Sequence, residues 1–413
     1  MYKRIINGVI ASFYGQGVTL IFQFLSVPLF ISAWGVERYG EWLTIFAIPM
    51  TLVMLDFGFF SILGNKISYA IQDNNSKLAQ GIINSVGISI FIIYIILISA
   101  VLMLGELFNF NIRLTILIPL LTYSMMVLLA NFIVNVFRAN REFHIGSLLS
   151  NTARLVENIF VIVSLILKFT MIEVALVYTI TRLVTTILMI CYLQGRYKWY
   201  SFNFNNKNCI TKSDVKDSLN YALMPMAFMM NNQGIIFILQ ILYGSTQVAI
   251  FVTARTYFRI INQFITAFTN SSWQEINYTV NQKDRVNLLS LMKRIIKLTL
   301  YSSMSIALIL SLSFDYILAK WTSNQIQIPH IQSFFIMLSV VIFSLWQPYY
   351  VFLSASGEYK KHTRFYFLSQ VMNLLFLYIF NFSFQHALMF LLVSECLMLV
   401  YSRRCYLNRL DLI

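Results

Sequence analysis

The sequence predicts an all-helical integral membrane protein with about twelve transmembrane helices. Hydrophobic residues make up 58% of the 413 residues and charged residues only 11%, whereas a soluble domain carries roughly 25% charged residues. Apolar stretches of about twenty residues recur along the whole chain, and each can cross about 30 Å of hydrocarbon as a helix. Lysine and arginine gather in the short segments between these stretches, as they do in membrane proteins.

The expected spans follow one another at short intervals. They cover residues 9–31, 42–63, 81–104, 114–137, 147–167, 173–193, 218–242, 248–270, 295–314, 331–356, 364–384 and 387–402. The first stretch follows the basic start MYKR, but it is too long for a signal peptide and lacks a small-x-small cleavage site. We therefore interpret it as an uncleaved first helix.

The basic residues determine the expected topology. With the amino terminus in the cytoplasm, the opposite side of the membrane holds only Arg38, Arg113, Lys168 and Lys320. Positive residues favour the cytoplasmic side, so we expect a multi-pass protein with both termini in the cytoplasm. Because the net charge of +14 is spread over short loops and forms no contiguous basic face, it does not indicate a nucleic-acid partner.

The longest polar connection, with the run RYKWYSFNFNNKNCITKSDVK, divides the chain into halves. We expect an N-terminal six-helix lobe over residues 1–195, a cytoplasmic linker over 196–217 and a C-terminal six-helix lobe over 218–413. Such lobes can be related as parallel repeats with a substrate path between them. The segments GVERYGEWLT and GSTQVAIFVT, which begin at Gly35 and Gly244, agree with a repeat because they share a leading glycine, an aromatic residue and a threonine.

Ionisable residues inside the spans are expected to face protein or water, because an unpaired charge in hydrocarbon costs several kcal/mol. In the eighth span, Arg255, Arg259 and Asn262 follow a helical spacing that places them on one face. Several spans carry such polar faces, which predicts a shared cavity with a cationic lining. The expected anion-attracting residues are Arg154, Arg182, Arg255 and Arg259, and the expected polar lining consists of Gln16, Gln23, Asn151, Asn158, Asn231 and Asn262.

Structural roles compete with this interpretation. Arg154 and Glu157 are spaced i, i+3 in the fifth span, so they can form an ion pair that merely fixes helix packing. Arg182 can pair with Asp56 or Glu395 across helices. By contrast, the eighth span contains no carboxylate that could pair with Arg255 or Arg259. For these two arginines, an anion-attracting cavity is therefore favoured over a purely structural role.

No enzyme motif is apparent. The sequence has no GxxxxGK[ST] phosphate loop, no GxSxG and no HExxH, and its cysteines show no CxxC spacing. We therefore expect no enzymatic activity, no cofactor and no metal. Transport would depend on an ion gradient or on the gradient of the substrate, and Asp56, Glu157 and Glu395 are the candidates for carrying a coupling ion.

Two further residue types have an expected place. Pro28 and Pro225, in the first and seventh spans, are candidate hinges because a proline removes a backbone donor from the helix. Trp346, Tyr349 and Tyr350 are interpreted as part of an aromatic belt at the membrane boundary.

The chain resembles the Wzx-type O-antigen flippases, polysaccharide-exporting members of the multidrug/oligosaccharidyl-lipid/polysaccharide (MOP) superfamily. The resemblance covers essentially the full chain: its length, its twelve spans, its cytoplasmic ends and the opening NGVIASFYGQGVTLIFQFLSVPLFISAWGVERYGEW. Within that opening, WGVERYGEW at residues 34–42 looks like the family's first extracytoplasmic loop. The resemblance implies a MATE-like fold of two six-helix lobes.

The resemblance also implies a function, namely translocation of undecaprenyl-diphosphate-linked oligosaccharide repeat units across the bacterial inner membrane. The family is thought to use alternating access, with a proton or sodium gradient as driver. The expected partners are this lipid-linked oligosaccharide, the membrane lipids, an O-antigen polymerase and a chain-length regulator.

Three rival functions fit the sequence less well. An exporter of cationic drugs is expected to line its cavity with acidic residues, a polymerase to carry a large periplasmic loop, and a lipid II flippase to have fourteen spans.

Overall fold

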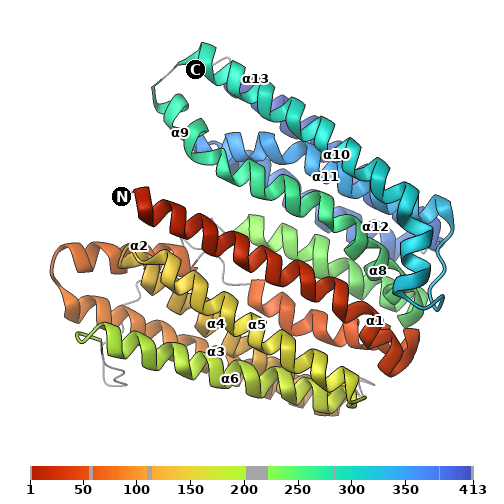
Figure 1. Ribbon diagram of the computed structural model, residues 1–413, viewed down its shortest axis with the longest axis horizontal. Helices are drawn as coiled ribbons and strands as arrows, with labels where there is room; N and C mark the ends of the chain where they lie inside the picture. Colours follow the sequence, from red (N-terminus) through yellow and green to blue (C-terminus); the bar gives the residue numbers. More distant parts are fainter. Residues whose placement is uncertain are drawn as a thin grey trace. The chain divides into compact units, whose positions relative to one another are not determined.

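The computed structural model describes residues 2–54, 59–108, 114–200, 222–282, 284–380 and 382–410. These residues are almost entirely helical and contain no strand (Figure 1). The N-terminal half holds α1 (Tyr2–Met54), α2 (Phe59–Gln72), α3 (Ser76–Phe108), α4 (Leu114–Ala139), α5 (Phe143–Ile166) and α6 (Met171–Arg196). Residues 222–229 lead into a π-helical turn, η1 (Met230–Gly234), which is followed by α8 (Ile235–Ser271), α9 (Trp273–Asn281), α10 (Arg285–Trp321), α11 (His330–Ala355), α12 (Tyr359–Phe380) and α13 (Phe384–Leu410).

Nine helices in the described part of the chain are long and apolar enough to cross a membrane. Two of them, Phe13–Met54 with 42 residues and Ala222–Thr266 with 45, are each long enough for two crossings at 1.5 Å per residue. α12 is not one of the nine, although its 22 residues suffice for a crossing. The nine helices, the second crossing in each of the two long ones, and α12 together give twelve crossings, which confirms the predicted fold class.

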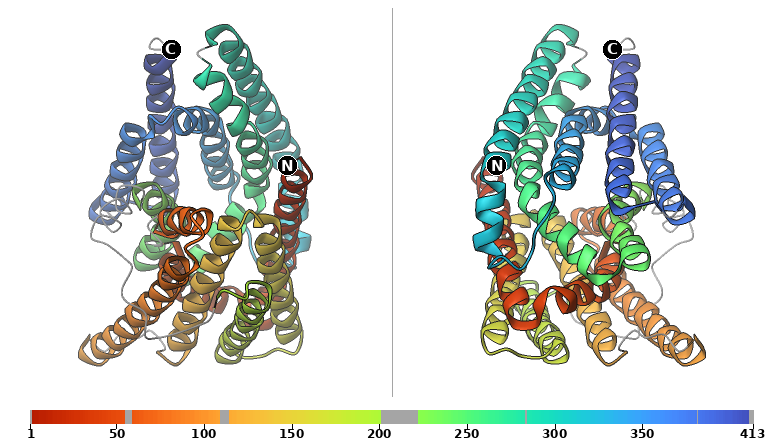
Figure 2. Two further views of the ribbon diagram at one scale, coloured as in Figure 1. Left: turned by 90° about the vertical axis from the view of Figure 1, so that its left-hand side faces the viewer. Right: turned by 90° about the vertical axis from the view of Figure 1, so that its right-hand side faces the viewer.

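The two long helices are broken at glycines. Gly35 in α1 has φ 79° and ψ 169°, and Gly244 in α8 has φ 81° and ψ 176°. This conformation is essentially restricted to glycine, and it turns the chain from one crossing into the next without a loop. The change of direction along α1 is visible in Figure 2. The two glycines that open the related segments of the sequence thus have the same backbone conformation, whereas Pro28 lies within the helical part of α1.

The chain divides into two compact units, which are described separately. Unit 1 comprises Met1–Trp34 and Glu41–Met226, and unit 2 comprises Gly35–Gly40 and Ala227–Ile413. In unit 1, α4 packs against α2, α3, α5 and α6. Buried apolar side chains such as Ile67, Val86 and Phe137 fill the space between these helices, so the core of unit 1 is built around α4.

In unit 2, α11 is the central helix and packs against α8, α10 and α13. Trp346 of α11 and Met398 of α13 are completely buried. The outward faces remain strongly apolar, since Leu312 of α10 is 80% exposed and Val400 of α13 is 69% exposed. Large exposed apolar side chains of this kind are expected where a helix faces lipid.

Candidate functional site

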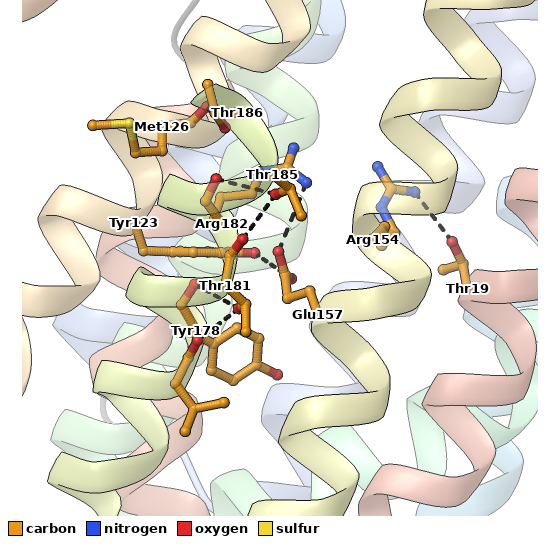
Figure 3. A network of polar contacts seen from close by, with 11 residues as sticks. Thr19, Tyr123, Met126, Arg154, Glu157, Tyr178, Thr181, Arg182, Thr185 and Thr186 are labelled. Atoms are coloured by element: carbon orange, nitrogen blue, oxygen red, sulfur yellow. Dashed lines mark hydrogen bonds and ion pairs between the residues drawn. The ribbon is translucent and has the colours of Figure 1, made fainter. Parts of the chain in front are cut away.

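A buried cluster of charged and polar side chains lies at the centre of unit 1, where α4, α5 and α6 meet. The Arg182 guanidinium of α6 lies 3.7 Å from the Glu157 carboxylate of α5, and the two side chains are 3% and 5% exposed. The Tyr123 hydroxyl of α4 donates a hydrogen bond of 2.9 Å to the same carboxylate (Figure 3). One acidic side chain therefore joins three helices.

This pairing differs from both alternatives that the sequence suggested. Glu157 pairs with Arg182 and not with Arg154. Residues spaced i, i+3 on a helix are separated by about 60° around its axis; here Glu157 faces α6 while Arg154 faces α1 (Figure 3). Arg182 pairs within unit 1 and not with Glu395, and Asp56 lies outside the described residues.

Arg154 has a neutral partner. Its Nη1 donates a hydrogen bond of 3.2 Å to the Thr19 hydroxyl of α1, and that hydroxyl donates in turn to the Gly15 carbonyl at 2.9 Å. Among the described residues, no carboxylate lies within ion-pair distance of Arg154. Within the described ranges, its positive charge therefore lies on the α1-facing side of α5 without a carboxylate in ion-pair contact.

A second cluster lies in unit 2, where α8 meets the π-helical turn η1. Arg255 donates from Nη1 to the Asn231 backbone carbonyl at 3.0 Å and from Nη2 to the Asn231 side-chain oxygen. Arg259, one helical turn further along α8, donates from Nη2 to the Asn232 side-chain oxygen at 3.1 Å. Turns of π-helix widen the backbone and are frequent at functional sites. In this turn, the two consecutive asparagines each reach one of the arginines.

Glu395 of α13 completes this cluster. Its carboxylate accepts hydrogen bonds from the Asn231 amide at 2.7 Å and from the Trp346 indole nitrogen at 2.8 Å. Asn231 thus accepts from Arg255 with its side-chain oxygen and donates to Glu395 with its side-chain nitrogen. Within the described residues, neither arginine of the cluster forms a direct ion pair, so the amide separates the guanidinium of Arg255 from the nearest carboxylate.

The assignment of Trp346 to an aromatic belt is wrong. Its side chain is completely buried in the interior of unit 2, where it packs against Phe343 and Tyr366. The buried indole N–H requires an acceptor, and Glu395 provides it. The sequence motif contains a tryptophan followed by tyrosines, which is equally typical of a membrane interface, so the pattern alone could not distinguish the two positions.

The predicted polar lining residues occupy different environments. Asn151 is buried and donates to the Ala11 carbonyl at 2.9 Å, which ties α5 to α1. Asn158 is also buried, and Asn262 accepts a hydrogen bond from the Ser344 hydroxyl of α11. Gln16 is exposed on the surface of unit 1, and Gln23 is half-buried.

Sequence reasoning missed two members of these clusters. Tyr123 lies inside α4, and its hydroxyl is buried and donates to Glu157. The signal in the sequence was a tyrosine inside a span, because a buried tyrosine hydroxyl needs a hydrogen-bond partner. Gln370 of α12 lies 3.5 Å from the Asn231 amide nitrogen through its side-chain oxygen; an amide inside a span was again the signal. Across the described ranges, no group of three or more His, Cys, Asp or Glu side chains could hold a metal ion.

No protein-family model and no curated protein sequence matches this chain. Solved structures do match it along almost its full length. A multidrug resistance MATE family transporter of the MOP superfamily in an inward-facing conformation has a TM-score of 0.76 at 14% identity, with 95% of each chain covered. An outward-facing structure of such a transporter has a TM-score of 0.63 at 15% identity, with 99% of this chain and 96% of that chain covered.

A third match is a MOP superfamily transporter from Pyrococcus furiosus Vc1, described as having a binding pocket of reverse polarity that suggests a different function. Its TM-score is 0.65 at 14% identity, and the comparison covers 99% of this chain and 96% of that one. Similarity at this level of identity concerns the arrangement of the helices. The chain therefore has the fold of the MATE family transporters of the MOP superfamily.

Proposed function

We propose that this protein is a flippase that translocates undecaprenyl-diphosphate-linked O-antigen repeat units across the bacterial inner membrane by alternating access, driven by an ion gradient. One observation carries the proposal. Among the described residues, the polar contacts inside each unit involve two arginines and a single glutamate, although Arg154 of unit 1 lies on the other side of α5 from Glu157. An excess of positive charge at membrane depth is energetically costly, and charged residues that are kept there commonly mark a substrate or ion pathway.

The substrate class follows from the partners of these arginines. Arg154 and Arg259 are bonded to a hydroxyl and an amide oxygen, which are neutral acceptors. Guanidinium groups form stronger, charge-assisted hydrogen bonds with phosphate oxygens. A diphosphate-linked lipid can therefore replace the neutral acceptors and supply the missing negative charge.

The transport cycle is proposed from the fold and from the carboxylates. The fold is that of transporters solved in inward-facing and outward-facing conformations, and alternation between two such states is the simplest cycle for a flippase. Glu157 and Glu395, each bonded to polar partners in the middle of its unit, are the proposed carriers of the coupling ion, together with Asp56. In this proposal both termini lie in the cytoplasm, and an O-antigen polymerase and a chain-length regulator act on the product.

A second candidate is export of another substrate by the same fold, either a drug or another polysaccharide precursor. The structural similarity to a multidrug resistance transporter supports this candidate through the fold. The charge of the clusters favours an anionic substrate over a cationic drug, because arginines repel cations. A membrane-bound enzyme of the polysaccharide pathway is the least favoured alternative.

The test is complementation of a bacterial strain that lacks its own O-antigen flippase. The double variant Arg255→Ala with Arg259→Ala should abolish surface polysaccharide while the amount of protein in the membrane stays unchanged. The matched control is Lys293→Ala with Lys297→Ala, which removes two exposed basic residues from α10 and should preserve surface polysaccharide. Normal polysaccharide in the arginine double variant would refute the proposed role of the unit 2 cluster.

A further inference from the structure

A polar groove lies between α2 and α4 of unit 1, near the end of α4 that is remote from Tyr123. Its volume is about 340 Å³, and its lining consists of Gly64, Asn65, Ser68, Asn135, Arg138 and Ala139. α2 and α4 pack directly against each other. The groove therefore lies between two helices of one unit and is separate from the cluster around Glu157.

Beside Gly64 and Ala139, the lining of the groove contains polar side chains and one positive charge. Arg138 is exposed, and its guanidinium lies 5.8 Å from the centre of the Phe143 ring. Within the described ranges, no carboxylate lies within ion-pair distance of Arg138, and no carboxylate lines the groove. Asn65 and Ser68 present an amide and a hydroxyl from α2. Guanidinium, amide and hydroxyl donors around an open volume match the acceptor oxygens of a phosphate group.

The position of the groove along the helices narrows the choice of ligand. α4 has 26 residues, so it is about 39 Å long and exceeds the roughly 30 Å of hydrocarbon by several ångströms. Arg138 is the last residue but one of this helix, so a helix centred in the bilayer would carry it at the level of the lipid headgroups. Tyr69, on the adjacent turn of α2, is 67% exposed, as expected of an aromatic side chain in the interfacial layer.

We propose that this groove binds the phosphate group of a membrane lipid headgroup. Arg138 forms the charge-assisted hydrogen bonds, and Asn65 and Ser68 donate to the remaining oxygens. A Cβ atom at Gly64 would be in ordinary van der Waals contact with the Cβ atom of Asn135, 3.7 Å away, so the missing side chain leaves a gap between α2 and α4. The site goes beyond the proposed flippase function, because binding here requires neither transport nor the arginines of unit 2.

The experiment measures retention of dioleoyl phosphatidylglycerol by the purified full-length protein in detergent, using native mass spectrometry. The variants are Arg138→Gln, which removes the charge, and Arg138→Lys, which keeps it. The matched control is Arg141→Gln, which removes an exposed positive charge three residues further along the chain and outside the lining. Circular dichroism and size-exclusion chromatography establish that each variant is folded.

We expect Arg138→Gln to weaken lipid retention about tenfold, Arg138→Lys to restore part of it and Arg141→Gln to leave it unchanged. The variant Arg255→Ala with Arg259→Ala should retain the lipid like the unmodified protein, so failure of the flippase proposal and failure of this site give different results. Equal retention by Arg138→Gln and the unmodified protein would overturn the site. Displacement of the lipid by micromolar inorganic pyrophosphate would assign the groove to a soluble phosphate and would overturn the lipid assignment.

Discussion

The guanidinium of Arg182 and the carboxylate of Glu157 lie 3.7 Å apart inside unit 1, and each side chain is at most 5% exposed. Glu157 also accepts a hydrogen bond from the hydroxyl of Tyr123. Two opposite charges buried together are stable only as a pair, because removal of one leaves the other without compensation in a medium of low dielectric constant. The orientation of α6 relative to α5 therefore depends on this pair.

Substitution of Glu157 by Gln should destabilise the protein by about 3 kcal/mol, because the charge of Arg182 then loses its partner. The measurement is thermal unfolding of the purified protein in detergent. Glu157→Gln combined with Arg182→Gln should cost less than the sum of the two single variants, since neither charge remains. Glu37→Gln, at an exposed position, serves as the control and should leave the unfolding temperature unchanged. If the double variant lost as much stability as the two single variants together, the two side chains would not interact.

Gly35→Ala and Gly244→Ala should each destabilise the protein by roughly 1–3 kcal/mol, because both residues have a backbone conformation that a Cβ atom disfavours. Nothing lies within 4 Å of a Cβ atom built at either glycine, so the cost comes from the backbone and not from a clash. Gly17→Ala is the matched control. Gly17 lies in the helical part of α1, also with nothing within 4 Å, and its substitution should raise stability by about 0.5–1 kcal/mol. The same thermal unfolding measurement compares all three, and a stabilising effect at Gly35 would contradict the assigned backbone conformation.

The contact of Glu142, at the start of α5, with Arg196 and Tyr197, at the end of α6, should stabilise the protein to a degree that depends on pH. Glu142 accepts two hydrogen bonds of 2.6 Å from Arg196 and one of 2.6 Å from Tyr197. The bonds from Arg196 are the main reason that the pKa of Glu142 falls from 4.5 to about 2. A carboxyl group with a lowered pKa in the folded state stabilises the protein above its ordinary pKa, and this contribution is lost as the pH falls.

We therefore expect the unfolding temperature to decrease between about pH 4.5 and pH 2 by more in the unmodified protein than in Glu142→Gln. Arg196→Gln should reduce the pH dependence similarly, because it removes the main cause of the shift. The effect should weaken at high salt, since the ion pair is partly exposed. Identical pH profiles for all three proteins would show that the link contributes nothing to stability.

The sequence was sufficient to predict the elements of the fold because the bilayer imposes a strong pattern on each crossing. About twenty apolar residues are needed for every helix, and this requirement is visible in α3, α4 and α11 without any knowledge of their neighbours. The glycines at positions 35 and 244 were also recognisable as related, because the segments that they open share an aromatic residue and a threonine. The structure adds that both have a backbone conformation that essentially only glycine tolerates.

The partners within the clusters could not be predicted, because they depend on how each helix is rotated about its axis. The spacing of Arg154 and Glu157 suggested a pair on one helix, but Glu157 faces α6. Nothing in the sequence indicated that a π-helical turn would bring Asn231 to Arg255, because such a turn depends on a single additional residue in the helix. Whether the arginines line one shared cavity stays a prediction.

The assignment of residues 35–40 to unit 2 limits how the protein can be divided. A Cβ atom added to Gly40 would lie only 1.8 Å from the Ser245 carbonyl oxygen, so the backbones at these two positions are almost in direct contact. The polypeptide thus leaves unit 1 after Trp34 and returns to it at Glu41. A gene fragment that ends at the long polar connection would encode a first half without the backbone against which its own turn at residues 35–40 is packed. Split versions of this protein should therefore mature only when both fragments are synthesised in the same cell.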